Sequence, residues 1–135
     1  GLPTAEKIKM KIGSAHPLQE EFEMDVRGRD ALQGVPRSEV VTSVDIREAV
    51  SGCVAEIDQA VRKVLEETDP ELASDLMEHG ILLAGGGSQL LGLDAHLQEV
   101  THGLKVRRAE TPLHAVVHGV LVALEQLDTY RDMLQ

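Results

Sequence analysis

The chain has 135 residues, a length that suits one domain or two small lobes built around a hydrophobic core. Only 1% of the residues are aromatic, which argues against a protein that stacks single-stranded bases on aromatic rings. The formal net charge of −10 repels phosphate backbones, so we expect no nucleic-acid partner.

The amino-terminal part of the sequence predicts a helix followed by a β-hairpin. A helix is expected over residues 5–12, with Thr4 as its cap. Apolar and charged residues alternate over residues 22–27, which is the period-two pattern of a half-buried strand. A turn-rich stretch over residues 28–36 leads to a second short strand at residues 40–41. We expect the two strands to pair as a hairpin.

A long amphipathic helix of about 20 residues is expected next, with Ser43 as its cap. Cys53 is the single cysteine, so the chain has no intrachain disulfide and no cysteine cluster for zinc. We expect Cys53 to be a small core residue rather than a reactive thiol, because it lies on the apolar stripe of this helix. The stripe consists of Ile46, Val50, Cys53, Val54, Ile57, Val61, Val64 and Leu65.

The remainder of the sequence alternates helices with strands. Asp69 and Pro70 open a short helix, and the apolar run at residues 81–84 predicts a strand buried on both faces, as in a parallel sheet. A further helix is expected over residues 93–101 and a further strand over residues 104–108. This order is typical of an α/β fold with right-handed crossovers. The last helix is expected to begin at Thr111 and Pro112. The residues expected to face inward are Leu113, Val116, Val117, Val120, Leu121, Leu124 and Leu127.

Three consecutive glycines and Ser88 form the loop after the buried strand. A strand, a loop without Cβ atoms and a following helix allow the backbone to approach a flat or phosphorylated ligand closely. A tight turn that requires positive φ explains the same residues. The loop lacks the Lys of a Walker A motif and the spacing of a dinucleotide-binding fingerprint. The glycines are Gly85, Gly86 and Gly87.

Glu6 and Lys9 lie three residues apart on one side of the first helix. A Lys stem can lie along a base while a carboxylate accepts hydrogen bonds from ribose hydroxyls. An exposed ion pair worth a few tenths of a kcal/mol is the alternative.

His114 and His118 have a spacing at which two histidines can bind a metal ion, but Ala115 replaces the Glu of the thermolysin-type motif. We expect them instead to pack near the start of their helix, and we assign no metal ligand. No set of nucleophile, base and orienting residue is recognisable, so we assign no catalytic residue.

Six short motifs occur in a fixed order along nearly the whole chain, at residues 4–15, 24–30, 34–36, 70–88, 91–94 and 109–116. Together they resemble segments of the MreB/Mbl family of bacterial actin-like rod-shape-determining proteins. The matching segments lie in the carboxy-terminal part of those proteins, which includes most of their second domain. The resemblance implies part of an actin-like, ribonuclease H-like ATPase domain. Residues 1–42 would form a small upper subdomain of helix and hairpin, and residues 43–135 the end of the lower subdomain.

The resemblance also implies a function. Such proteins bind ATP with Mg²⁺, polymerise into filaments under the cytoplasmic membrane and guide cell-wall synthesis with elongation proteins at its inner face. We therefore expect self-association and a cytoplasmic, membrane-peripheral location. The resemblance assigns the adenosine pocket to Glu6, Lys7, Ile8 and Lys9 on one side and to Gly85, Gly86, Gly87 and Ser88 on the other.

The family's phosphate loops and catalytic carboxylate would lie upstream of residue 1, so we expect negligible ATPase activity and weak nucleotide binding from these residues alone. Two alternatives remain open. One is an independent α/β interaction module whose glycine loop is only a turn. The other is a different member of the actin, sugar-kinase and chaperone ATPase superfamily, although the helix and hairpin at the start favour MreB.

Overall fold

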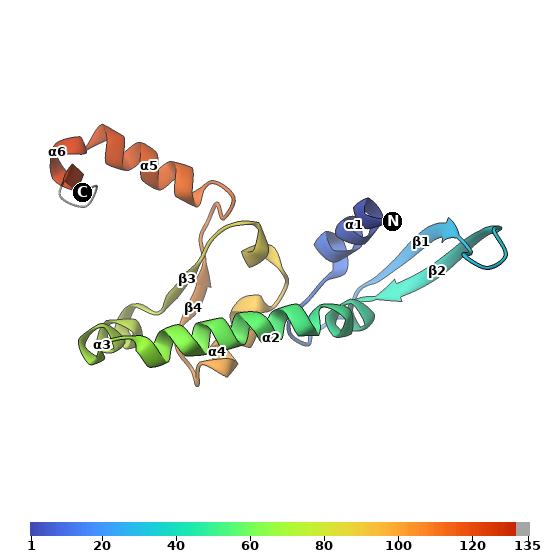
Figure 1. Cartoon of the computed structure of the whole chain (residues 1–135), viewed down its shortest axis with the longest axis horizontal. Helices are drawn as coiled ribbons and strands as arrows, with labels where there is room; N and C mark the ends of the chain where they lie inside the picture. Colours follow the sequence, from blue (N-terminus) through green and yellow to red (C-terminus); the bar gives the residue numbers. More distant parts are fainter. Residues whose placement is uncertain (132–135) are drawn as a thin grey trace.

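The computed structural model describes residues 1–131. The long helix α2 (Ser43–Glu67) runs through the middle of the molecule. The first helix and the hairpin lie at its N-terminal end, and a small α/β unit lies along its C-terminal half (Figure 1). Within the described residues, no helix combines the length and apolar character that crossing a bilayer requires.

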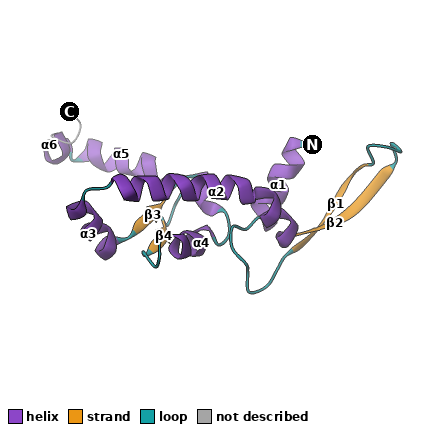
Figure 2. Ribbon diagram, turned by 60° about the horizontal axis from the view of Figure 1, so that its bottom comes forward, coloured by secondary structure: helices purple, strands orange, loops and turns teal. Residues whose placement is uncertain are grey.

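The predicted helix and hairpin at the start of the chain are confirmed. Helix α1 (Leu2–Ile12) starts earlier than expected, because a proline fits the first turn, so the prediction that Thr4 is its cap is wrong. Strands β1 (Glu23–Arg29) and β2 (Pro36–Thr42) pair antiparallel. Figure 2 shows the hairpin extending away from the rest of the molecule.

Helix α2 is capped by Thr42 and not by Ser43 as predicted. The Thr42 hydroxyl accepts a hydrogen bond from the amide of Asp45, and the Asp45 carboxylate accepts one from the amide of Thr42 at 2.8 Å. These reciprocal bonds form a capping box. Ser43 is fully buried and uses its hydroxyl differently, accepting a 2.9 Å hydrogen bond from the amide of Phe22.

The α/β pattern predicted for the second half of the chain is present. The strands β3 (Ile81–Leu83) and β4 (Val106–Arg108) pair in parallel, as predicted. The prediction that β3 is buried on both faces is wrong, since Leu82 at its centre is 58% exposed. Among the described strands, only β4 pairs with β3. The elements are α3 (Pro70–His79), β3 (Ile81–Leu83), the 3₁₀ helix η1 (Gly86–Gln89), α4 (Leu93–Val100) and β4 (Val106–Arg108).

The hydrophobic core lies between α2, α4 and the loop after α1. Leu97 is 1% exposed and packs with three other buried residues, Ala15, Val54 and Leu93. A side-chain contact between His96 on α4 and Asp58 on α2, at 2.9 Å, fastens the two helices beside this core. The core therefore joins three segments that are distant in sequence: the loop after α1, the middle of α2, and α4.

Helix α5 (Ala115–Glu125) and the short α6 (Leu127–Tyr130) extend away from this core (Figure 1). The prediction that their apolar side chains face inward is wrong. Periodicity correctly identified an apolar helix, but no described element packs over it. The exposed side chains are Leu113, Val116, Val117, Val120, Leu121, Leu124 and Leu127.

Candidate functional site

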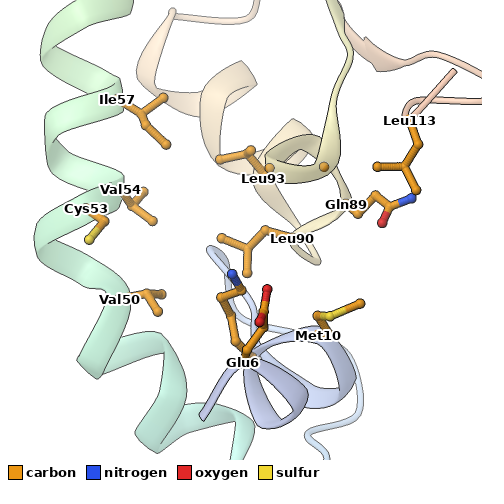
Figure 3. A pocket seen from close by; sticks show the side chains of 13 residues that line it. Glu6, Met10, Val50, Cys53, Val54, Ile57, Gln89, Leu90, Leu93 and Leu113 are labelled. Carbon is orange, nitrogen blue, oxygen red and sulfur yellow. The ribbon is translucent and has the colours of Figure 1, made fainter. Parts of the chain in front are cut away.

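A cavity of about 660 Å³ lies between α1, α2 and η1. Figure 3 shows Glu6 and Met10 rising from α1, Val50, Val54 and Ile57 pointing in from α2, and Leu90 between the two helices. The cavity is mostly apolar, with two charged side chains on the α1 side. Its lining residues are Glu6, Lys9, Met10, Val50, Cys53, Val54, Ile57, Gly86, Gly87, Gln89, Leu90, Leu93 and Leu113.

The structure brings the two predicted halves of the site to this one cavity. Glu6 and Lys9 border it from α1, and Gly86 and Gly87 border it from the glycine turn. Among residues 1–131, Glu6 and Lys9 form no ion pair with each other or with another residue. The carboxylate and the ammonium group are both available to a ligand.

The other predicted residues do not line the cavity. Lys7 is exposed elsewhere on α1, and Ile8 borders a second, smaller groove. Gly85 and Ser88 build the turn itself: the amide of Gly85 donates to the carbonyl of Pro112 at 2.8 Å, and the Ser88 hydroxyl donates to the carbonyl of Gly85 at 2.7 Å. Ser88 is only 4% exposed, so its hydroxyl is committed to this internal bond.

The glycine turn uses its glycines in two different ways. Gly85 has φ +81°, a conformation that side chains other than glycine adopt only with strain. Gly86 and Gly87 have ordinary φ values, and a Cβ on Gly87 would meet no atom of the described residues within 4 Å. A Cβ on Gly86 would meet only Leu113, at 3.5 Å. Gly85 therefore shapes the turn, while Gly86 and Gly87 leave bare backbone on the cavity wall.

Main-chain hydrogen bonds hold the two walls of the cavity together. The segment after α1 forms a short parallel bridge with the segment after η1, where the amide of Ala15 donates to the carbonyl of Leu91 at 2.7 Å. In the reverse direction, the amide of Leu91 donates to the carbonyl of Gly13 at 3.4 Å. The position of α1 relative to the glycine turn is thus set at the C-terminal end of α1.

A polar cluster supports this bridge from α2. The Arg47 guanidinium donates to the buried Ser14 hydroxyl at 3.0 Å and to both Glu21 carboxylate oxygens at 2.7 Å. The Ser43 hydroxyl donates to Glu21, and together with Arg47 it holds the pKa of Glu21 below its ordinary value. The cluster lies outside the cavity, so its role is to fix the loop between α1 and the hairpin.

Sequence reasoning missed several lining residues. Met10 lies one helical turn after Glu6, so helical periodicity could have placed it on the same face. Gln89 and Leu113 carry no such signal, because their positions depend on how η1 and the loop before α5 fold. The prediction that Cys53 is a core residue is wrong: it is exposed and borders the cavity.

The two histidines at the start of α5 are exposed, so the prediction that they pack there is wrong. Within residues 1–131, no group of three or more His, Cys, Asp or Glu side chains is arranged to hold a metal ion. Within the described part of the chain, this cavity is where predicted ligand-binding residues from α1 (Glu6, Lys9) and from the glycine turn (Gly86, Gly87) come together.

Comparison with known proteins decides the family. Residues 1–132 match the family model described as MreB/Mbl protein. The chain belongs to the MreB/Mbl family. It is 46% identical over 130 residues to the cell shape-determining protein MreB of Escherichia coli K12, and 41% identical over 128 residues to the cell shape-determining protein Mbl of Bacillus subtilis 168. These alignments cover 96% and 95% of this chain but only 37% and 38% of the two relatives.

The fold matches solved structures of MreB proteins. The crystal structure of MreB5 of Spiroplasma citri bound to ADP superposes with a TM-score of 0.89 at 30% identity, over 98% of this chain and 40% of MreB5. The AMPPNP-bound form of MreB5 gives a TM-score of 0.88 over 100% of this chain and 40% of MreB5. The predicted α/β, actin-like fold is therefore confirmed, and the MreB/Mbl resemblance of the sequence with it. The chain spans about 37–40% of the length of these relatives.

Proposed function

We propose that this chain supplies the adenosine side of an ATP site in a cell-shape-determining, actin-like protein. In the whole protein, ATP with Mg²⁺ would be bound between two domains. Subunits would assemble into filaments at the inner face of the cytoplasmic membrane, where they would meet cell-wall elongation proteins. Membership of the MreB/Mbl family and the nucleotides in the two MreB5 structures support this proposal.

One observation carries the nucleotide part of the proposal: Glu6, Lys9, Gly86 and Gly87 border a single cavity. Its volume of about 660 Å³ lies within the range of small-molecule sites, roughly 300–1,000 Å³. Such sites combine a mostly apolar lining with a few polar groups, and this cavity has that composition. The residues present therefore fit an adenosine.

Each residue has a chemical role in this proposal. The flat base lies against the bare backbone of Gly86 and Gly87, where a side chain would exclude it. The stem of Lys9 covers the opposite face of the base, since lysine stems pack along apolar surfaces while the ammonium group stays in water. The Glu6 carboxylate accepts hydrogen bonds from the ribose hydroxyls. Lys7 and Ile8 complete the helix that presents these groups, and Gly85 and Ser88 hold the turn in shape.

The same residues do not fit a metal site or a catalytic apparatus. Among residues 1–131, Glu6 is the only carboxylate that lines the cavity, and Mg²⁺ is bound in proteins through carboxylates together with the phosphates. We therefore assign this chain the binding and orientation of the nucleoside, and no hydrolytic step. The division into an upper subdomain at residues 1–42 and a lower part at residues 43–135 belongs to this proposal.

The proposal is tested by replacing Gly87 with valine and titrating with ADP. The φ of Gly87 is ordinary and no atom of residues 1–131 lies within 4 Å of the position of its Cβ, so the fold should tolerate the change. We expect ADP affinity to fall at least about tenfold, which corresponds to about 1.4 kcal/mol. Gly119→Val is the matched control, because Gly119 lies on α5 with equally open space around it and away from the cavity. Equal affinity of both variants would refute the nucleotide role.

The alternative is a stand-alone α/β interaction module without a nucleotide role. The exposed apolar side chains on α5 favour a protein that associates with another molecule, because contiguous apolar patches on a surface mark contact sites. The ADP titration separates the two functions. An interaction module would bind no ADP in either the unmodified chain or the Gly119→Val variant.

A further inference from the structure

Helix α1 borders two neighbouring hollows. One is the cavity described above, and the other is a groove of about 450 Å³ between α1 and the N-terminal half of α2. Glu6, Lys9 and Val50 border both hollows. The groove is lined mainly by apolar side chains that face one another without filling the space: Leu2, Ala5 and Ile8 from α1, and Ile46, Ala49 and Val50 from α2.

The N-terminal part of α1 is weakly held. Leu2, the first residue of the helix, is 87% exposed, whereas Ile12 at the other end is only 5% exposed. The first turn has no side-chain cap. Among the side-chain hydrogen bonds and ion pairs of the described residues, none involves residues 1–12. Elements with few buried contacts and uncapped ends open most readily.

The C-terminal end of α1 is, in contrast, fixed. Gly13 follows the helix in an extended conformation, with φ −69° and ψ 135°, and a Cβ there would come within 2.3 Å of the Lys9 carbonyl oxygen. The chain therefore leaves the helix abruptly at Gly13 and enters the bridge to Leu91 directly. Helix α1 is therefore held at its C-terminal end, through Gly13, and is free at its N-terminal end.

We propose that α1 is a hinged wall of the nucleotide cavity, pivoting at Gly13. Without a ligand on Glu6 and Lys9, α1 closes on α2 and buries Ala5 and Ile8 against Ala49 and Ile46, because burying apolar surface is favourable. A nucleoside held by Glu6 and Lys9 keeps α1 away from α2 and the groove open. The ligand changes the position of α1 because it binds one of the two arrangements better. This inference rests on the proposed function.

The experiment measures closure of the groove with paired cysteines. Ala5→Cys and Ala49→Cys, which lie on opposite walls of the groove, are introduced into a Cys53→Ser background and cross-linked with a short bismaleimide. We expect rapid cross-linking of the ligand-free protein and, at saturating ADP, a rate lower by about fivefold or more. The control pair is Asp58→Cys with His96→Cys, which spans the α2–α4 contact and should react at one rate with or without ADP.

The outcomes separate this inference from the proposed function. Equilibrium dialysis of ADP with the same proteins shows directly whether the nucleotide binds. If ADP binds but does not change the cross-linking rate of the cysteines at positions 5 and 49, the hinged wall is overturned and the proposed function stays intact. Failure of the groove pair to cross-link in the ligand-free protein would overturn it as well. Absence of ADP binding to the unmodified chain would overturn the proposed function, and the nucleotide-controlled hinge with it.

Discussion

The main-chain amide of Ala15 lies 2.7 Å from the carbonyl oxygen of Leu91, and the hydrogen bond between them joins the two walls of the cavity. Ala15 comes three residues after the end of α1, and Leu91 comes two residues after the end of η1. The predicted halves of the site are distant in sequence, and this bridge is what sets their separation.

The bridge depends on a glycine immediately after Leu91. Gly92 has φ +69°, and a Cβ there would lie 2.9 Å from the Cβ of His16. We expect Gly92→Ala to destabilise the fold by about 2–4 kcal/mol, since it combines backbone strain with a clash. Gly103→Ala is the matched control: its φ is +97° but no atom lies within 4 Å, so it should show the strain alone. Urea unfolding measures the loss in the free energy of unfolding for each variant. Equal losses for Gly92→Ala and Gly103→Ala would mean that the His16 contact is unimportant.

The polar cluster behind the bridge predicts a dependence of stability on pH. Hydrogen bonds from Ser43 and Arg47 lower the pKa of Glu21 in the folded protein, so the unfolded state takes up a proton first as the pH falls. The stabilisation is therefore complete above the ordinary glutamate pKa of about 4.3 and is lost as the pH falls through the lower folded pKa.

Glu21→Gln tests this dependence. The difference in the free energy of unfolding between the original chain and the variant should be largest near neutral pH and should shrink below about pH 4. Glu20→Gln is the matched control, because it removes the neighbouring exposed carboxylate, which hydrogen-bonds to neither Ser43 nor Arg47. A difference that is constant from neutral to acid pH would contradict the role assigned to the Glu21 carboxylate.

Two leucines with the same chemistry test where the core lies. Leu97 is 1% exposed, whereas Leu121 on α5 is 50% exposed. We expect Leu97→Ala to lower the free energy of unfolding by about 2–5 kcal/mol, because it leaves a cavity in the core. Leu121→Ala should cost less than about 1 kcal/mol, as is usual for side chains that pack against little. Similar costs in chemical denaturation would show that α5 packs against the body of the protein.

The local elements follow from the sequence because they depend on short-range patterns. The period-two alternation in β1 and the three–four spacing in α2 identified a hairpin and a long helix correctly. The cap of α2 was misplaced by one residue, although Thr42 and Asp45 carry the spacing of a capping box in the sequence itself. The reciprocal pair, and not the polar residue nearest the first helical turn, identifies the cap of this helix.

Burial was predicted less well, because periodicity identifies an apolar face but not the partner that covers it. Val120 lies on a correctly predicted apolar stripe of α5 and Leu82 at the centre of a correctly predicted strand, yet both are more than half exposed. The thiol of Cys53 is exposed beside a cavity for a similar reason, since the stripe of α2 is wider than the surface packed against it. Covering depends on tertiary contacts that one sequence segment does not contain.

The candidate site was predicted in part. Family resemblance indicated the glycine turn and the charged face of α1, and the structure brings Glu6, Lys9, Gly86 and Gly87 to one cavity. The family resemblance does not distinguish the glycine that shapes the turn from those that face the cavity. That distinction needs the φ of Gly85 and the open space beside Gly87, which are properties of the folded backbone.

If the cavity between α1 and the glycine turn receives an adenosine, a nuclear magnetic resonance titration of the ¹⁵N-labelled chain with ADP reports it residue by residue. We expect the amide signals of Lys9, Gly86 and Gly87 to shift together along one binding curve, while that of Gly119 on α5 stays in place. Saturable binding of ADP that leaves the signals of Lys9, Gly86 and Gly87 unmoved would contradict it.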